Sequence, residues 1–188
     1  MPNKVKYNLK NVHWALATST GYSDTVKAWP GAVSLSLEPQ GDDYIFYADG
    51  INYFEYHTNN GYEGDLETAL IPEDFLTGVL GEVLDDNNNL VEVDDVQAIK
   101  FALGFQIDGD AKGTYFWFYN CSASRPTVAS STKEETIEAQ TETLNFSNKP
   151  DPNITVNDKH PVKVKSGNSS TVTETEWFSA VQLPEVTP

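Results

Sequence analysis

Strand-like runs broken by turn residues occupy positions 31 to 54 of this chain, where the sequence reads GAVSLSLEPQGDDYIFYADGINYF. A period of two places one set of side chains on each face of a strand, so the first run predicts a half-buried β-strand. Asp49-Gly50 separates two aromatic-rich runs and predicts a type I′ hairpin turn, because glycine accepts positive φ without a Cβ clash. The predicted strand sets three apolar positions against three polar ones: Val33, Leu35 and Leu37 against Ser34, Ser36 and Glu38.

The same pattern of short runs and turn residues continues through the chain. Strands are expected at 31–38, 43–49, 51–57, 64–71, 101–108, 114–121 and 171–181. The run 114–121 (TYFWFYNC) is aromatic on both faces, so we expect it between two layers or in an interface. The single predicted helix starts at Ile71-Pro72, carries Phe75, Leu76, Val79 and Leu80 on one face, and ends at Gly81.

Many short strands with one helix predict an all-β fold, mainly an antiparallel sandwich or small barrel with one short flanking helix and extended arms. The 188 residues fit one domain with a sizeable core. We expect this domain to comprise an N-terminal arm at 1–12, a β-rich body at 13–147, a polar loop at 148–170 and a C-terminal strand and tail at 171–188.

A long alternating strand is predicted at 132–146. One face carries Thr132, Glu134, Thr136, Glu138, Gln140 and Glu142. The opposite face carries Ile137 and Ala139, which we expect to point toward the core. A one-residue slip of register would exchange the two faces. We expect this strand and the strand at 31–38 to be neighbours, with Ser34, Ser36 and Glu38 continuing the polar face.

Charge is distributed unevenly along the chain. Residues 28–99 contain sixteen Asp and Glu but no Lys or Arg, and they account for the whole formal net charge of −16. The remaining residues balance twelve acids with twelve bases. Such a chain should repel the phosphates of nucleic acid, so we do not expect it to bind DNA or RNA. A solvated acidic surface and a conduit that must not hold DNA are both compatible with these charges.

Targeting and redox signals are sparse. We expect no membrane span, since no run approaches 18 apolar residues, and no signal peptide, since the N-terminal lysines precede no apolar segment. The lone Cys121 fits a reducing compartment. The sequons at Asn120, Asn145, Asn153 and Asn168 are interpreted as coincidence in a chain rich in Asn, Ser and Thr.

The residues that catalysis needs are not grouped in the sequence. His13, His57 and His160 lack partners at metal-ligand spacing, and Cys121 ends an apolar strand, where a buried inert thiol is expected. The acidic segment 85–95 resembles a calcium loop only in part, since it lacks the central glycine and the twelfth-position glutamate. We therefore expect no enzyme activity, no cofactor and no metal site, and weak cation binding at 85–95 remains the alternative to a solvated turn.

Three long segments resemble the phi13-type major tail proteins of long-tailed bacteriophages. They are the segment at 31–54, GYEGDLETALIPEDF at 61–75 and YNCSASRPTVASSTKEETIEAQTETL at 119–144. They occur in the family's order, and the resemblance spans roughly residues 5–147.

The resemblance implies a structural virion protein that forms stacked rings, usually of six subunits, around a lumen. The implied partners are other copies of the chain, the tape measure protein, and the tail terminator and distal tail proteins. Genomic DNA passes without specific binding, no membrane takes part, and the subunit is made in the host cytoplasm. Within this picture we expect Ser34, Ser36, Glu38, Glu134, Glu138 and Glu142 to face the lumen. Lys4, Lys6 and Lys10 are expected to form an arm that docks on the acidic body of a neighbouring subunit.

Two other classes of function remain open at this stage. A carbohydrate-binding β-sandwich would use exposed aromatic residues as a stacking platform, and it predicts a soluble monomer with an aromatic groove. A glycoside-cleaving enzyme would need two carboxylates facing each other across a groove, and the sequence does not pair them.

Overall fold

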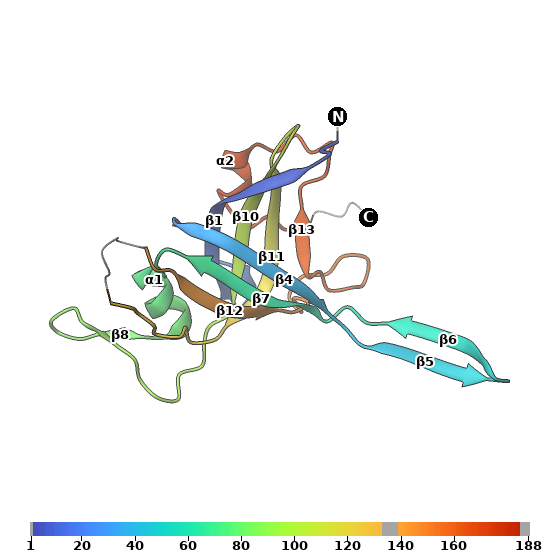
Figure 1. Ribbon diagram of the computed structural model, residues 1–188, viewed down its shortest axis with the longest axis horizontal. Coiled ribbons are helices and arrows are strands. Elements are labelled where there is room, and N and C mark those ends of the chain that lie inside the picture. The colour runs from blue at the N-terminus through green and yellow to red at the C-terminus, as the bar shows by residue number, and fades with distance from the viewer. Residues whose placement is uncertain (1, 133–138, 185–188) are drawn as a thin grey trace.

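A computed structural model describes residues 2–132 and 139–184 of the chain (Figure 1). Its strands are β1 (Lys6–Thr18), β2 (Gly21–Tyr22), β3 (Lys27–Trp29), β4 (Ala32–Gln40), β5 (Asp43–Ala48), β6 (Ile51–His57), β7 (Gly61–Thr68), β8 (Val83–Leu84), β9 (Leu90–Val91), β10 (Phe101–Gly109), β11 (Thr114–Ala123), β12 (Glu142–Asn148) and β13 (Lys163–Lys165). Its helical segments are α1 (Glu73–Phe75), the π-helical turn η1 (Leu76–Leu80) and α2 (Glu174–Trp177).

One antiparallel sheet organises the described residues. Its strand order is β2-β1-β10-β11-β12-β7-β4, with β3 paired to β1 and β13 paired to β11. The sheet bends so that β4, at one edge, comes close to β1 near the other (Figure 1). The expected all-β, mainly antiparallel fold is thus confirmed.

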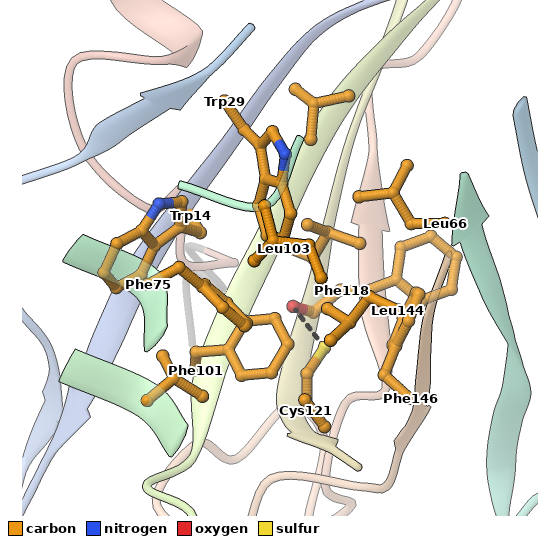
Figure 2. Packing of buried hydrophobic residues seen from close by; sticks show 14 of the residues in the cluster. Trp14, Trp29, Leu66, Phe75, Phe101, Leu103, Phe118, Cys121, Leu144 and Phe146 are labelled. Carbon is orange, nitrogen blue, oxygen red and sulfur yellow. Dashed lines mark hydrogen bonds between the residues drawn. The ribbon is translucent and has the colours of Figure 1, made fainter. Parts of the chain in front are cut away.

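The main core lies inside the bend of this sheet (Figure 2). Phe75 from α1 packs at its centre, edge-on against Trp14 and Phe101 with ring centroids 5.1 Å away in each case. Trp29 tilts against the same ring, and its indole Nε1 donates a hydrogen bond to Thr68 Oγ1. The predicted helix is therefore confirmed, and its function in the fold is to carry Phe75 and Val79 into this core.

A second, smaller core covers the other face of β10 and β11. Along β11, Trp117 and Tyr119 alternate with Phe116 and Phe118, so the two sets reach opposite layers. The expectation that this aromatic strand lies between layers is confirmed. The second layer is formed by the C-terminal segment, which packs Trp177 and Phe178 against β11.

The prediction of a C-terminal strand at 171–181 is wrong, because this segment contains the helix α2. Thr173 caps this helix: its hydroxyl accepts from Glu176 N–H, and the Glu176 carboxylate accepts from Thr173 N–H. This reciprocal capping box supplies donors and acceptors that an isolated strand would leave unpaired. The expected polar loop at 148–170 also contains a strand, β13.

The strand predicted at 132–146 needs a similar correction. Residues 133–138 lie outside the described residues, and residues 139–141 are not in a strand. The strand β12 starts at Glu142 and pairs with β7 over its whole length. Because β7 lies between β12 and β4, the expected neighbourhood of these two polar strands is also wrong.

Val33 marks the limit of the alternation in β4. A register shift between Ala32 and Ser34 interrupts the pairing of β4 with β7. Such a bulge inserts one extra residue into a strand, so the residues before and after it no longer follow one continuous alternation of faces. Leu35 and Leu37 pack against the core as predicted, whereas Val33 is 53% exposed.

Candidate functional site

The hairpin β5–β6 projects from the body of the protein (Figure 1). Its two strands pair with each other and with no other strand of the described residues. Its turn residues Asp49 and Gly50 have φ of 52° and 76°, so both central positions are left-handed, as a type I′ turn requires. The sequence prediction of this turn is confirmed.

One face of the hairpin is aromatic. Tyr44 lies opposite Tyr56, and Phe46 lies opposite Phe54, so these four side chains share a face. They are 47–57% exposed, although rings of this size are usually buried. Tyr44 and Phe54 lie 6.4 Å apart by ring centroid, so the rings support one another but are not covered.

The other face of the hairpin carries Asp43, Glu55 and His57 together with the exposed side chains of Ile45 and Tyr47. His57 Nδ1 lies 2.6 Å from Asp43 Oδ1, and its Nε2 lies 3.1 Å from Glu55 Oε1. The hydrogen bond and charge of Asp43, followed by the charge of Glu55, raise the pKa of His57 above its ordinary value. When His57 is protonated, its ion pair with Asp43 joins the two strands. The hairpin has no Lys or Arg.

A second surface is the outer face of strands β4, β7 and β12. The pairing aligns three polar rows across it, namely Ser34–Glu67–Thr143, Ser36–Asp65–Asn145 and Glu38–Glu63–Ser147. None of these nine residues is a cation. We call this set the acidic sheet face.

Two contacts define the electrostatics of the acidic sheet face. The Glu67 carboxylate accepts from the hydroxyls of Thr141, at 2.7 Å, and Ser34, at 2.9 Å, and these bonds lower its pKa. Glu38 lies directly opposite Glu63, and like charges at paired positions destabilise a sheet. The face therefore holds negative charge at some expense to stability.

Three of the residues expected to face a lumen, Ser34, Ser36 and Glu38, lie on the acidic sheet face and are exposed. Glu134 and Glu138 lie outside the described residues. Glu142 is on the opposite face of β12, the one that carries Leu144 and Phe146. Its carboxylate accepts a 2.6 Å hydrogen bond from Ile71 N–H, which corrects the predicted orientation.

The sequence analysis did not assign Glu63, Asp65 and Glu67 to this surface. The signal was present, since these acids alternate with Gly64, Leu66 and Thr68 along β7. A period of two identifies such a face but does not identify the strands on either side of it. Only the pairing with β4 and β12 collects the acids into one surface.

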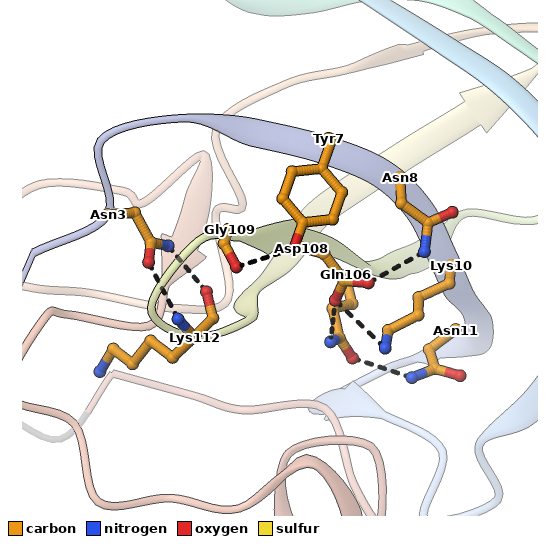
Figure 3. Close-up of polar contacts among 9 residues, drawn as sticks. All are labelled: Asn3, Tyr7, Asn8, Lys10, Asn11, Gln106, Asp108, Gly109 and Lys112. Atoms are coloured by element: carbon orange, nitrogen blue, oxygen red, sulfur yellow. Dashed lines mark hydrogen bonds and ion pairs between the residues drawn. The ribbon is translucent and has the colours of Figure 1, made fainter.

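The N-terminal residues do not form a free arm. Lys6 begins β1, which pairs with β10 of the same chain, and Lys10 forms an ion pair with Asp108 at 3.1 Å. Asn3 donates to Lys112 O and accepts from Lys112 N–H (Figure 3). Asp110 accepts from Lys4 N–H. The expected extended arm is thus corrected to an edge strand.

Two asparagines shape this edge strand. Asn8 and Asn11 have φ of 57° and 52°, and register shifts interrupt the pairing of β1 beside each of them. Asn8 Nδ2 donates to Asp108 Oδ2, and this bond is the largest cause of the lowered pKa of Asp108 (Figure 3). The bulges orient Asn8 and Lys10 toward one carboxylate.

The described ranges place His57 beside Asp43 and Glu55 on the hairpin. No three of their His, Cys, Asp and Glu residues are placed to hold a metal ion. Burial raises the pKa of the Cys121 thiol, so the thiol stays protonated. In the loop at 85–95, the Asp85 carboxylate accepts from Asn87 and Asn89 of its own turn. No helix of the described part has the length and hydropathy of a membrane span.

No family model and no curated protein matches this chain. Among solved structures, it is similar to a chain from the "Cryo-EM structure of the anti-feeding prophage (AFP) baseplate, 6-fold symmetrised". The identity is 10% and the TM-score is 0.45, over 90% of this chain and 99% of that chain. A likeness this distant carries no conclusion about function, which we argue from the residues of the chain.

Proposed function

We propose that this chain is a structural subunit that assembles with copies of itself into the tail tube of a long-tailed bacteriophage. Rings of six subunits stack into a tube, which the tape measure protein fills first and through which DNA passes later. The tube ends on the tail terminator and distal tail proteins. The proposed role is structural rather than catalytic, and the proposed location is the virion, after synthesis in the host cytoplasm.

The observation that carries self-assembly is the aromatic face of β5–β6. Four half-exposed aromatic side chains offer roughly 400 Å² of contact surface. The largest apolar patch on a typical soluble protein has about this size and is often an interaction site. Within the described residues no segment covers this face, so we propose that another subunit does.

The acidic sheet face supports the second part of the proposal, a wall that faces DNA. Glu38, Glu63, Asp65 and Glu67 lie together without a Lys or Arg among the rows. A surface of this charge repels phosphates and keeps a passage from becoming a binding site. We propose this face as the lumen wall, with Ser34, Ser36 and Glu38 as originally expected and with the β7 acids added. Glu134 and Glu138 remain predictions, whereas Glu142 is assigned to the core side.

Assembly is tested with the double variant Phe46→Ser/Phe54→Ser. We expect the unaltered chain to form rings or tubes on concentration, seen by sedimentation and negative-stain microscopy, and the variant to stay monomeric and folded. The control is Leu70→Ser/Val128→Ser, which removes two apolar side chains elsewhere that are even more exposed than Phe46 and Phe54, and it should still assemble. An unaltered chain that stays monomeric at high concentration would contradict the proposal.

The wall is tested with Glu38→Lys/Glu63→Lys/Asp65→Lys. Assembly should persist, because these side chains contact no other subunit in the proposed arrangement. DNA ejection from particles that carry the variant should slow or stall, because lysines bind phosphates. Normal DNA ejection by the variant would show that this face does not line the lumen.

The carbohydrate-binding alternative makes the opposite prediction from the same aromatic face. It expects a monomer whose tyrosine fluorescence responds to oligosaccharides, and Phe46→Ser/Phe54→Ser would abolish that response. Self-assembly without a sugar response excludes it.

A further inference from the structure

The N-terminal end of β1 is an exposed edge with both charge and apolar surface. Val5 and Tyr7 are 58% and 56% exposed, and they alternate with Lys4 and Lys6. Lys10 and Lys27 have ion-pair partners, whereas neither Lys4 nor Lys6 forms an ion pair with another described residue. We call residues 4–7 the lysine edge.

A surface groove continues the lysine edge along β1. Leu9 and Val12 line one side, and Trp29 and Ala32 line the other. Strand β3 pairs with β1 only from Val12 onward, so the outer side of residues 6–11 has no strand partner within the described ranges. Two residues that line this opening, Leu9 and Ala32, are only partly buried.

The hairpin β5–β6 matches this surface in charge. The hairpin and the loop before it carry four acids, Asp42, Asp43, Asp49 and Glu55, against one histidine, His57, and no Lys or Arg occurs from residue 28 to residue 99. The lysine edge has the opposite charge and apolar side chains between its lysines. Opposite charges interleaved with apolar contacts favour one register of docking over others.

The two surfaces also match in length. The seven residues of β6 span about 23 Å at ~3.3 Å per residue. The stretch from Lys4 to Val12 is comparable, so a hairpin laid along it reaches both the lysine edge and the groove. The aromatic face alone is smaller than the ~800 Å² per partner of a stable interface, and this second set of contacts enlarges it.

We propose that the hairpin β5–β6 of one copy docks along the lysine edge and groove of a second copy of this chain. This inference rests on the proposed self-assembly and names the surfaces that meet. The two surfaces differ, so the contact is head-to-tail, and repetition closes a ring or extends a filament. Lys149 and Lys159 lie outside the proposed contact, so their replacement by Glu is a matched control for Lys4→Glu/Lys6→Glu.

The experiment is a charge exchange between two variants. Lys4→Glu/Lys6→Glu should raise the concentration needed for assembly by at least about tenfold, because acids then face acids. Asp43→Lys/Glu55→Lys should do the same from the other side. In an equimolar mixture every contact between unlike copies regains opposite charges, so assembly should return with the two variants alternating. Sedimentation and microscopy measure all three samples, and circular dichroism checks that each variant is folded.

Three results separate the possible failures. If Lys4→Glu/Lys6→Glu assembles like the control Lys149→Glu/Lys159→Glu, or if the mixture fails to recover, the inference is overturned while self-assembly stands. If the unaltered chain does not assemble, the proposed function falls and the inference falls with it. Tyr7→Ser adds a test without a charge change, and unimpaired assembly of that variant also counts against docking along β1.

Discussion

Two antiparallel aromatic hairpins in this protein meet opposite environments. In β10–β11, rings such as Phe105, Trp117 and Phe118 are at most 3% exposed, and layers cover both faces of β11. In β5–β6, the rings of Tyr44 and Phe54 are more than half exposed. Both hairpins are rich in aromatic residues, so aromatic content by itself does not tell whether another layer of the same chain covers a hairpin. The buried pair supports the fold, and the exposed pair is available to another molecule.

The largest expected difference is in the stability cost of removing a ring. Trp117→Ala should lower the free energy of unfolding by about 3–5 kcal/mol, because it leaves a cavity and frees the Trp177 carbonyl that Trp117 Nε1 now bonds. Phe54→Ala should change it by less than about 0.5 kcal/mol, because its ring is half exposed. Urea unfolding of monomeric samples measures both. Equal losses of unfolding free energy in the two variants would contradict the contrast between the buried and the exposed hairpin.

A smaller effect tests how closely the buried hairpin is packed. Gly104 lies opposite Trp117, and a Cβ added there would lie 2.8 Å from the indole ring. Gly104→Ala should therefore cost about 1–3 kcal/mol by overpacking. Gly167→Ala is the control, since its Cβ would meet open space, and it should be neutral within about 0.5 kcal/mol. A neutral Gly104→Ala would show that Trp117 can shift freely.

The smallest effect concerns pH and the exposed hairpin. Asp43 raises the pKa of His57 in the folded hairpin above the 6.5 of the free side chain. The stabilisation is therefore fully present below pH 6.5 and is lost as pH rises through the raised pKa. Amide protection in β5–β6, corrected for intrinsic exchange rates, should fall across this window and should not do so in His57→Gln. A titration of His57 at or below 6.5 would contradict the assignment.

Much of the fold follows from local patterns. The alternation of Leu35 and Leu37 predicted β4, Asp49-Gly50 predicted the hairpin turn, and the spacing of Phe75 and Val79 predicted the short helix. These predictions succeed because period, turn chemistry and glycine conformations act within a few residues. The errors arise where a distant segment decides, as at Val33, where a bulge against β7 changes the face.

The candidate site divides in the same way. The sequence by itself determined the aromatic hairpin, the cation-free stretch from 28 to 99 and the polar face of Ser34, Ser36 and Glu38. Only the tertiary structure decided that β7 adds its acids beside them, that Glu142 turns inward to Ile71, and that the N-terminal lysines lie on an edge strand paired with β10. The physical reason is that side-chain period is a property of one strand, whereas a surface is formed by strands that pair across long stretches of chain.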